Sequence, residues 1–164
     1  MNIQIKLLQL DDANLLYQFE KENKEYFETM VPSRGQEYYV FDHFLKQLHS
    51  LLDEQAEGLS YFYLIKSVNG EIVGRINLVD IEDSTGHLGY RVGEKYLGRG
   101  IASQAVRELL STTTIREINA KTTSNNFASQ RVLERNQFSL VTKDLEAISL
   151  NNQVVDFYHY RWER

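Results

Sequence analysis

Cysteine is absent from this sequence of 164 residues. Disulfide bridges, thiolate metal sites and a catalytic thiol are therefore excluded. The histidine, aspartate and glutamate residues do not fall at the spacing of metal ligands either, and a metal site needs several such side chains close together. We therefore expect chemistry that needs no metal.

Long hydrophobic runs and clusters of basic residues are also missing. No apolar run approaches the ~20 residues that span a bilayer. The N-terminus, MNIQIKLLQL, contains a lysine and no small-residue cleavage site, so it predicts a strand and not a signal peptide. The net charge is −5 without a basic stretch, which disfavours nucleic acid because phosphate neutralisation needs clustered cations. An acidic surface favours a cationic ligand such as an amine, and we expect a cytoplasmic location without membrane contact.

What is present suits one domain over residues 1–164. Hydrophobic residues make up 42% and charged residues 25% of the chain, which is enough for a core in a chain of this length. Alternating or β-rich segments predict strands at 3–7, 60–68, 71–81, 87–92, 116–122, from 138 and at 154–162. Helical spacing predicts helices that begin near residues 12, 39, 101 and 126.

The order of these segments predicts the fold class. The only proline, Pro32, lies in a segment at 26–35 that predicts a loop. Asn69 and Gly70 predict a hairpin turn, as do Asn151 and Asn152 between the last two strands. Strands that follow one another directly pair antiparallel, and strands separated by a helix can pair parallel. We expect an α/β fold with a mixed, mostly antiparallel central sheet and about four flanking helices.

The segment GYRVGEKYLGRGIA, residues 89–102, is the most informative one. A predicted strand ends at Val92, a loop with three glycines follows, and a helix begins. The N-terminus of a helix has unpaired N–H groups and a positive dipole end, so it binds anions, and glycines let the backbone approach a phosphate. With the positive charge of Arg99, this arrangement is typical of a diphosphate site. The alternative is a tight strand-to-helix turn at Gly98 and Gly100 without a ligand.

Two motifs in this region resemble the GNAT superfamily of N-acetyltransferases. The pyrophosphate loop of that family reads Gln/Arg-x-x-Gly-x-Gly/Ala, and this chain has Leu97, Gly98, Arg99, Gly100, Ile101 and Ala102. A second motif, Asn-x-x-Ser followed by an apolar pair and Gly-Phe, appears as Asn126, Ser129, Val132, Leu133 and Phe138, with Gln137 in place of the glycine. The apolar Leu97 and the upstream Gly-Tyr-x-Val resemble the ribosomal-protein (Rim-type) branch. The resemblance covers about residues 60–162.

The resemblance implies a fold and a set of ligand contacts. In the acyl-CoA N-acyltransferase fold, the fourth and fifth strands splay apart in a V that admits the pantetheine arm of acetyl-CoA. The backbone of Arg91 and Val92 is expected to pair with that arm like an added strand. Backbone amides of residues 98–102, next to Leu97, are expected to bind the pyrophosphate. Asn126 and Ser129 are expected to face the cofactor near its sulfur.

The catalytic residues are less clear from the motifs. Many family members carry a tyrosine seven residues after the motif asparagine, and it protonates the leaving thiolate; Leu133 stands at that position here. Ser129 is the candidate acid in its place, and the alternative is an ordinary small polar residue on a helix. Glu82 is the first candidate for a base, ahead of Asp83 and His87, and the alternative is that all three are merely solvated.

These interpretations predict an acetyl-CoA-dependent N-acetyltransferase that acts on a primary amine by direct attack in a ternary complex. The expected acceptor is the N-terminal α-amine of a protein, such as a ribosomal protein. One alternative is a small amine, such as a polyamine, an amino sugar or an antibiotic. Another is a non-catalytic sensor that binds coenzyme A. The aromatic last strand predicts core packing or a homodimer contact, through Phe157, Tyr158, Tyr160 and Trp162.

Overall fold

The computed structural model describes residues 1–150 and 153–164, and the side chains outside 145–152. The turn predicted at Asn151 and Asn152 lies outside the described residues. The chain forms a seven-stranded sheet with the order β1-β2-β3-β4-β5-β7-β6. The strands are β1 (Ile3–Leu7), β2 (Tyr61–Ser67), β3 (Ile72–Glu82), β4 (Thr85–Val92), β5 (Glu117–Thr123), β6 (Ser139–Leu150) and β7 (Gln153–Glu163). The α-helices are α1 (Ala13–Glu22), α2 (Lys24–Glu28), α3 (Phe41–Ala56), α4 (Ile101–Thr112) and α5 (Phe127–Arg135).

The pairing confirms the predicted fold class. Neighbouring strands are antiparallel except β4 and β5, which are joined through α4 and run parallel. Within the described residues α2 is a fifth helix beside the four expected ones. It overlaps the start of the segment at 26–35, for which the sequence predicts a loop. The sequence does not predict this helix because five residues are too few to show a helical period. Its buried residue Phe27 packs against Phe19 of α1, with ring centroids 5.8 Å apart.

Two hairpin turns fix the register of the sheet's first half. Gly70 has φ of 82° in the turn between β2 and β3, which glycine adopts without strain. The turn between β3 and β4 consists of Asp83 and Ser84, with φ of 50° and 60°. Positive φ at both central residues matches the twist of a two-residue hairpin. The strand predicted from His87 therefore begins two residues earlier, at Thr85.

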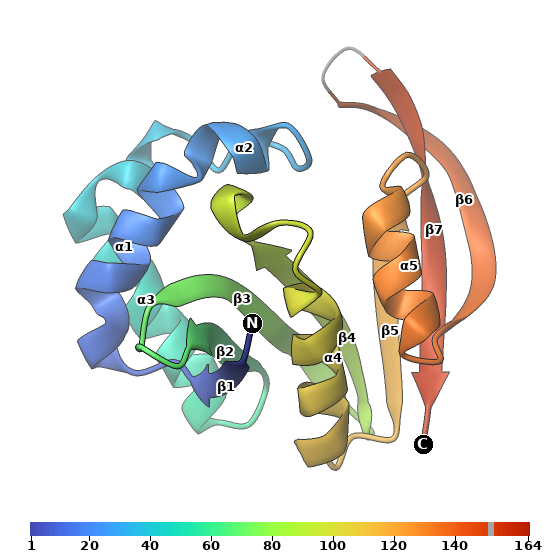
Figure 1. Ribbon diagram of the computed structural model, residues 1–164, viewed down its shortest axis with the longest axis horizontal. Coiled ribbons are helices and arrows are strands. Elements are labelled where there is room, and N and C mark those ends of the chain that lie inside the picture. The colour runs from blue at the N-terminus through green and yellow to red at the C-terminus, as the bar shows by residue number, and fades with distance from the viewer. Residues whose placement is uncertain (151–152) are drawn as a thin grey trace.

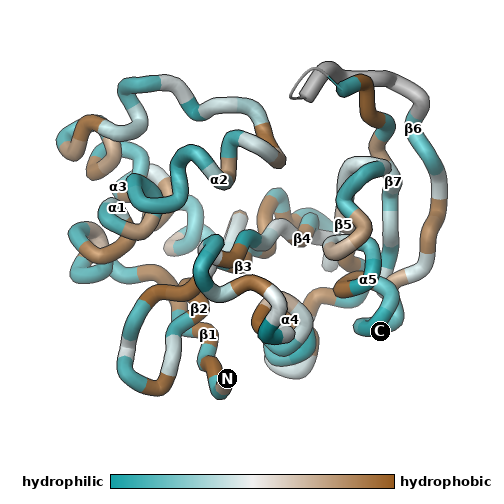
Figure 2. The backbone as a smooth tube through the Cα atoms, turned by 45° about the horizontal axis from the view of Figure 1, so that its top comes forward, coloured by the Kyte–Doolittle hydropathy of each residue, from teal (hydrophilic) through white to brown (hydrophobic). Residues whose placement is uncertain are grey.

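Helices cover both faces of the sheet. The predicted stripe Ile101, Ala105 and Leu109 of α4 is buried in a core with residues of β3, β4 and β5. A second core joins α1 and α3 to β2, and it includes Leu16, Phe44, Leu48 and Leu64. Figure 2 shows hydrophilic and hydrophobic residues interspersed along α1 and α3, as expected for helices with one face on a sheet. None of the helices in the described part of the chain is long and apolar enough to cross a membrane.

The sheet opens between β4 and β5. Residues 85–88 of β4 pair with residues 117–120 of β5, and the pairing stops there. Beyond that point β4 continues beside β3, and β5 continues beside β7 as far as Thr123. The two strands therefore diverge in the predicted V, toward the top of Figure 1.

Candidate active site

A pocket of about 460 Å³ lies at the opening between β4 and β5. It is lined by residues of β3, β4, β5, β7 and α5, by the start of α4 with the loop before it, and by α2 with the loop that follows it. The predicted ligand-binding residues that reach it are Arg91, Val92, Leu97, Ala102, Asn126 and Ser129. The fold thus brings the two motifs, nearly 30 residues apart in sequence, to one cavity.

The loop before α4 has the geometry that a diphosphate needs. Gly98 and Gly100 both have left-handed backbones, with φ of 74° and 71°. The amide of Gln104 makes the first helical bond, 3.1 Å to the carbonyl of Gly100, so the amides of residues 101–103 precede the hydrogen-bonded ladder. A Cβ on either glycine would meet no heavy atom within 4 Å, so there is open space beside the loop at both glycines. Arg99 is exposed beside them.

The free edge of β4 fits an extended ligand. Arg91 pairs with Arg75 of β3, and Val92 pairs with Gly74, on one side of the strand only. The other side has lost β5 as a partner. Backbone groups that point to this side can pair with an added, strand-like chain such as pantetheine.

Ser129 is held by Tyr90, the tyrosine of the Gly-Tyr-x-Val segment, for which the motifs predict no role. The hydroxyl oxygens of Tyr90 and Ser129 are 2.8 Å apart, and the Tyr90 hydroxyl is 3.2 Å from the Ser129 carbonyl oxygen. Burial raises the pKa of Tyr90 to about 12, so it is protonated at neutral pH. When Tyr90 donates to the Ser129 hydroxyl, the Ser129 hydrogen is free to point at a ligand. Leu133, at the family's tyrosine position, is a buried apolar residue.

Asn126 has a structural role in addition to lining the pocket. Its side-chain oxygen accepts a hydrogen bond from the amide of Ser129 at 3.1 Å, which caps α5. This cap fixes the first turn of α5 and with it the position of Ser129.

The structure does not bring the three base candidates to this pocket. Glu82, Asp83 and His87 are exposed at the far end of β4, where it still pairs with β5, and none of them lines the cavity. Of the described residues that do line it, none is a carboxylate or an imidazole. The role of Glu82 as a base stays a prediction, and its position gives it no support.

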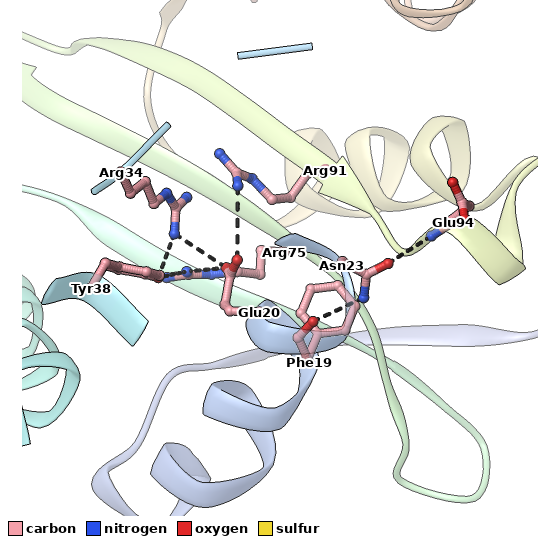
Figure 3. Close-up of polar contacts among 8 residues, drawn as sticks. All are labelled: Phe19, Glu20, Asn23, Arg34, Tyr38, Arg75, Arg91 and Glu94. Carbon is pink, nitrogen blue, oxygen red and sulfur yellow. Dashed lines mark hydrogen bonds and ion pairs between the residues drawn. The ribbon is translucent and has the colours of Figure 1, made fainter. Parts of the chain in front are cut away.

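Three arginines and one glutamate meet beside the pocket (Figure 3). Glu20 of α1 is fully buried and lies 2.7 Å from Arg75, 3.4 Å from Arg34 and 3.8 Å from Arg91. The Tyr38 hydroxyl accepts hydrogen bonds from Arg34 and, at 3.5 Å, from Arg75. All three arginines line the cavity.

The charges of this cluster are not balanced. Burial by itself raises the pKa of Glu20, but the three guanidinium groups hold that pKa below its ordinary value. Burial and the charge of Arg34 lower the pKa of Arg91 to about 10, because the single Glu20 carboxylate does not offset them. The site is therefore locally positive, whereas the chain as a whole is acidic. Sequence reasoning missed the cluster because its members come from four separate segments without a shared motif.

The fold agrees with the comparisons to known proteins. The sequence model of the acetyltransferase (GNAT) domain matches residues 2–139, so the chain belongs to the GNAT family. It is an N-acetyltransferase that uses acetyl-CoA as the acetyl donor. The chain is 24% identical over 144 residues to the probable N-acetyltransferase YjcK of Bacillus subtilis, covering 83% of this chain and 80% of that one.

Two solved structures have nearly the same fold. The ribosomal-protein-S5-alanine acetyltransferase from Vibrio fischeri superposes with a TM-score of 0.90 at 19% identity, covering 99% of this chain and 93% of that one. RimL, a ribosomal L7/L12 α-N-protein acetyltransferase in complex with coenzyme A, superposes with a TM-score of 0.89 at 24% identity, covering 99% and 94%. At these identities the likeness shows the shared fold.

Proposed function

We propose that this enzyme acetylates the N-terminal α-amine of a protein, with a ribosomal protein as the first candidate. The observation that carries the proposal is the lining of the pocket: its described side chains include no carboxylate or imidazole to act as a base. At pH 7 about one in seven α-amines, with a pKa near ~7.8, is neutral, against roughly one in 2,500 lysine side chains with a pKa near ~10.4. An acceptor that is already partly neutral suits a site without a base.

The charge of the pocket supports the same choice over a polyamine. Four cationic side chains line it: Arg34, Arg75, Arg91 and Lys121. Among the described residues, no carboxylate lines it. A polyamine carries several positive charges that these groups repel. The structural relatives that acetylate ribosomal proteins are consistent with a protein acceptor. We propose the cytoplasm as the location, where ribosomal proteins are made.

The residues of the site receive roles within this proposal. Backbone amides of the loop from Leu97 to Ala102 bind the diphosphate, and Arg99 adds a positive charge. The free edge of β4 at Arg91 and Val92 orients the pantetheine arm. Acetyl-CoA supplies the thioester, whose acyl carbon gains a bond to the amine nitrogen as its C–S bond breaks and the electron pair stays on sulfur.

Ser129 stabilises the sulfur that leaves. The Tyr90 and Ser129 hydroxyl oxygens are 2.8 Å apart and either can donate; with Tyr90 as the donor, the Ser129 hydrogen is left to point at the developing thiolate. A hydroxyl gains more from this bond as negative charge builds up, so the interaction favours the transition state over the ground state. The proton that the amine loses passes to water, because the described lining offers no other acceptor for it.

Release of free thiol from acetyl-CoA tests the proposal. Two peptides of matched length serve as acceptors: one has a free N-terminus and no lysine, and the other has a blocked N-terminus and one lysine. We expect turnover with the first and little with the second. Faster reaction of the blocked peptide, or spermidine or an aminoglycoside outcompeting every peptide, would overturn the proposal.

A further inference from the structure

The arginine cluster has more positive charge than its one acidic partner, Glu20, can balance. Among the described residues, Glu20 is the only acidic group in ion-pair contact with these arginines. Three guanidinium groups and one carboxylate leave two positive charges without an acidic partner, and burying unpaired charge is costly, so the cluster favours the binding of an anion.

The three arginines divide into two kinds. Arg75 and Glu20 are both buried and 2.7 Å apart, which is a structural pair between β3 and α1. Arg34 and Arg91 lie farther from Glu20, at 3.4 and 3.8 Å, and their side chains are 29% and 24% exposed. Both line the pocket, and Figure 3 shows them approaching Glu20 from the same side.

The surroundings of Arg91 hold its guanidinium in place for a ligand. Its planar group lies over the Phe27 ring, 4.7 Å from the ring centroid, and the 3.8 Å pair with Glu20 is beyond hydrogen-bond distance. A stacked, fixed guanidinium keeps its in-plane donors for a carboxylate or phosphate.

Asn77 of β3 carries another polar group without a partner, two residues along the strand from Arg75. The side-chain oxygen of Asn77 is buried without a hydrogen-bond partner, and Asn77 lines the pocket. Its partner across the strands is Gly89, where a Cβ would meet nothing within 4 Å. Asn77 lies two residues from Arg75 on the same face of β3, a separation of roughly 6–7 Å along a strand. An acceptor amine can donate to Asn77 while a group close to it reaches the arginines.

We infer that the acceptor carries a carboxylate or phosphate close to its amine, and that Arg34 and Arg91 bind it. The inference rests on the proposed function, and in a protein N-terminus the anion is an acidic side chain of the first two residues. The enzyme therefore selects acidic N-termini. The same anion in a small molecule, such as an amino acid, is the other source to be distinguished.

The experiment compares kcat/KM for two peptides that differ only by Asp against Asn at the second position. The wild-type enzyme is expected to prefer the Asp peptide about tenfold or more, the worth of a charge-assisted hydrogen bond. Arg34→Gln and Arg91→Gln are each expected to bring the ratio near one, and Arg34→Glu to reverse it in favour of a Lys peptide. Lys46→Gln removes an exposed charge from α3 and is expected to leave the ratio unchanged.

The outcomes separate the two proposals. Equal rates for the Asp and Asn peptides would overturn the acidic preference and leave α-amine acetylation standing. Variants that slow both peptides equally would also overturn it, since a purely structural role has that result. Acetylation of free aspartate, but not of its diamide or of any peptide, would overturn the protein acceptor while the anion site stands. Calorimetry with acetyl-CoA checks that each variant is folded and still binds the donor.

Discussion

Replacement of Gly100 by glutamate tests the diphosphate site most directly. Gly100 has φ of 71° and is the N-cap residue of α4, and a Cβ there would meet no heavy atom within 4 Å. Any other L-residue costs about 1–2 kcal/mol in the left-handed conformation, so stability falls modestly while the fold remains. The glutamate side chain projects from the loop whose amides are proposed to bind the diphosphate.

The magnitude follows from the charge. A carboxylate about 5 Å from one phosphate, at the effective dielectric of ~20 near a protein surface, raises the energy by about 3 kcal/mol. That is roughly two orders of magnitude in the Kd of acetyl-CoA. Salt screens exposed charges over about 10 Å at 0.1 M, so the effect is expected to shrink as the salt concentration rises.

Three further variants separate charge from bulk and strain. Gly100→Ala introduces the backbone strain alone, and Gly100→Gln adds the bulk without the charge. Gly70→Glu carries the same kind of strain, with φ of 82° and open space, at the turn between β2 and β3, away from the main pocket. Calorimetry gives the Kd, and thermal unfolding reports the strain. Equal binding by the Glu and Gln variants would refute the electrostatic reasoning, and unchanged binding by both would refute the site.

The other predictions concern catalysis, pH and stability. Ser129→Ala should lower kcat more than it weakens acetyl-CoA binding, and a change in kcat within about twofold would show that Ser129 is only structural. Tyr90→Phe should also lower kcat, by about five- to tenfold, which corresponds to the loss of one hydrogen bond. The rate on a peptide α-amine should rise with pH through about 8, and Glu82→Gln should leave that profile unchanged; a rate loss confined to neutral pH would restore Glu82 as the base. The pKa of Glu20 is held low, so its contribution to stability is present above the unfolded pKa of about 4.3 and is lost as the pH falls through the folded value. Glu20→Gln should lower the free energy of unfolding by about 3–5 kcal/mol, against little change for the exposed Glu22→Gln, as urea unfolding at neutral pH can check.

Local signals in the sequence determined much of the fold. The turn residues at Asn69 and Gly70 and the stripe of Ile101, Ala105 and Leu109 predict their elements because each signal lies within one element. The short helix α2 and the start of β4 at Thr85 were not predicted, because neither carries a clear signal within its own residues. The five residues of α2 are too few to show a helical period. The two-residue turn before β4 depends on positive φ values at Asp83 and Ser84, which these residue types allow but do not require.

The ligand loop could also be predicted from the sequence, because closely spaced glycines, a helix start and Arg99 lie together in one short segment. The acceptor side was not. Tyr90 meets Ser129 across 39 positions of the chain, and Glu20 meets Arg75 across 55. Such contacts exist only after the sheet has formed and α1 has packed on it. The net charge of −5 suggested a cationic ligand, whereas the pocket is positive, because composition averages over the surface and only the tertiary structure decides which charges are gathered and buried together.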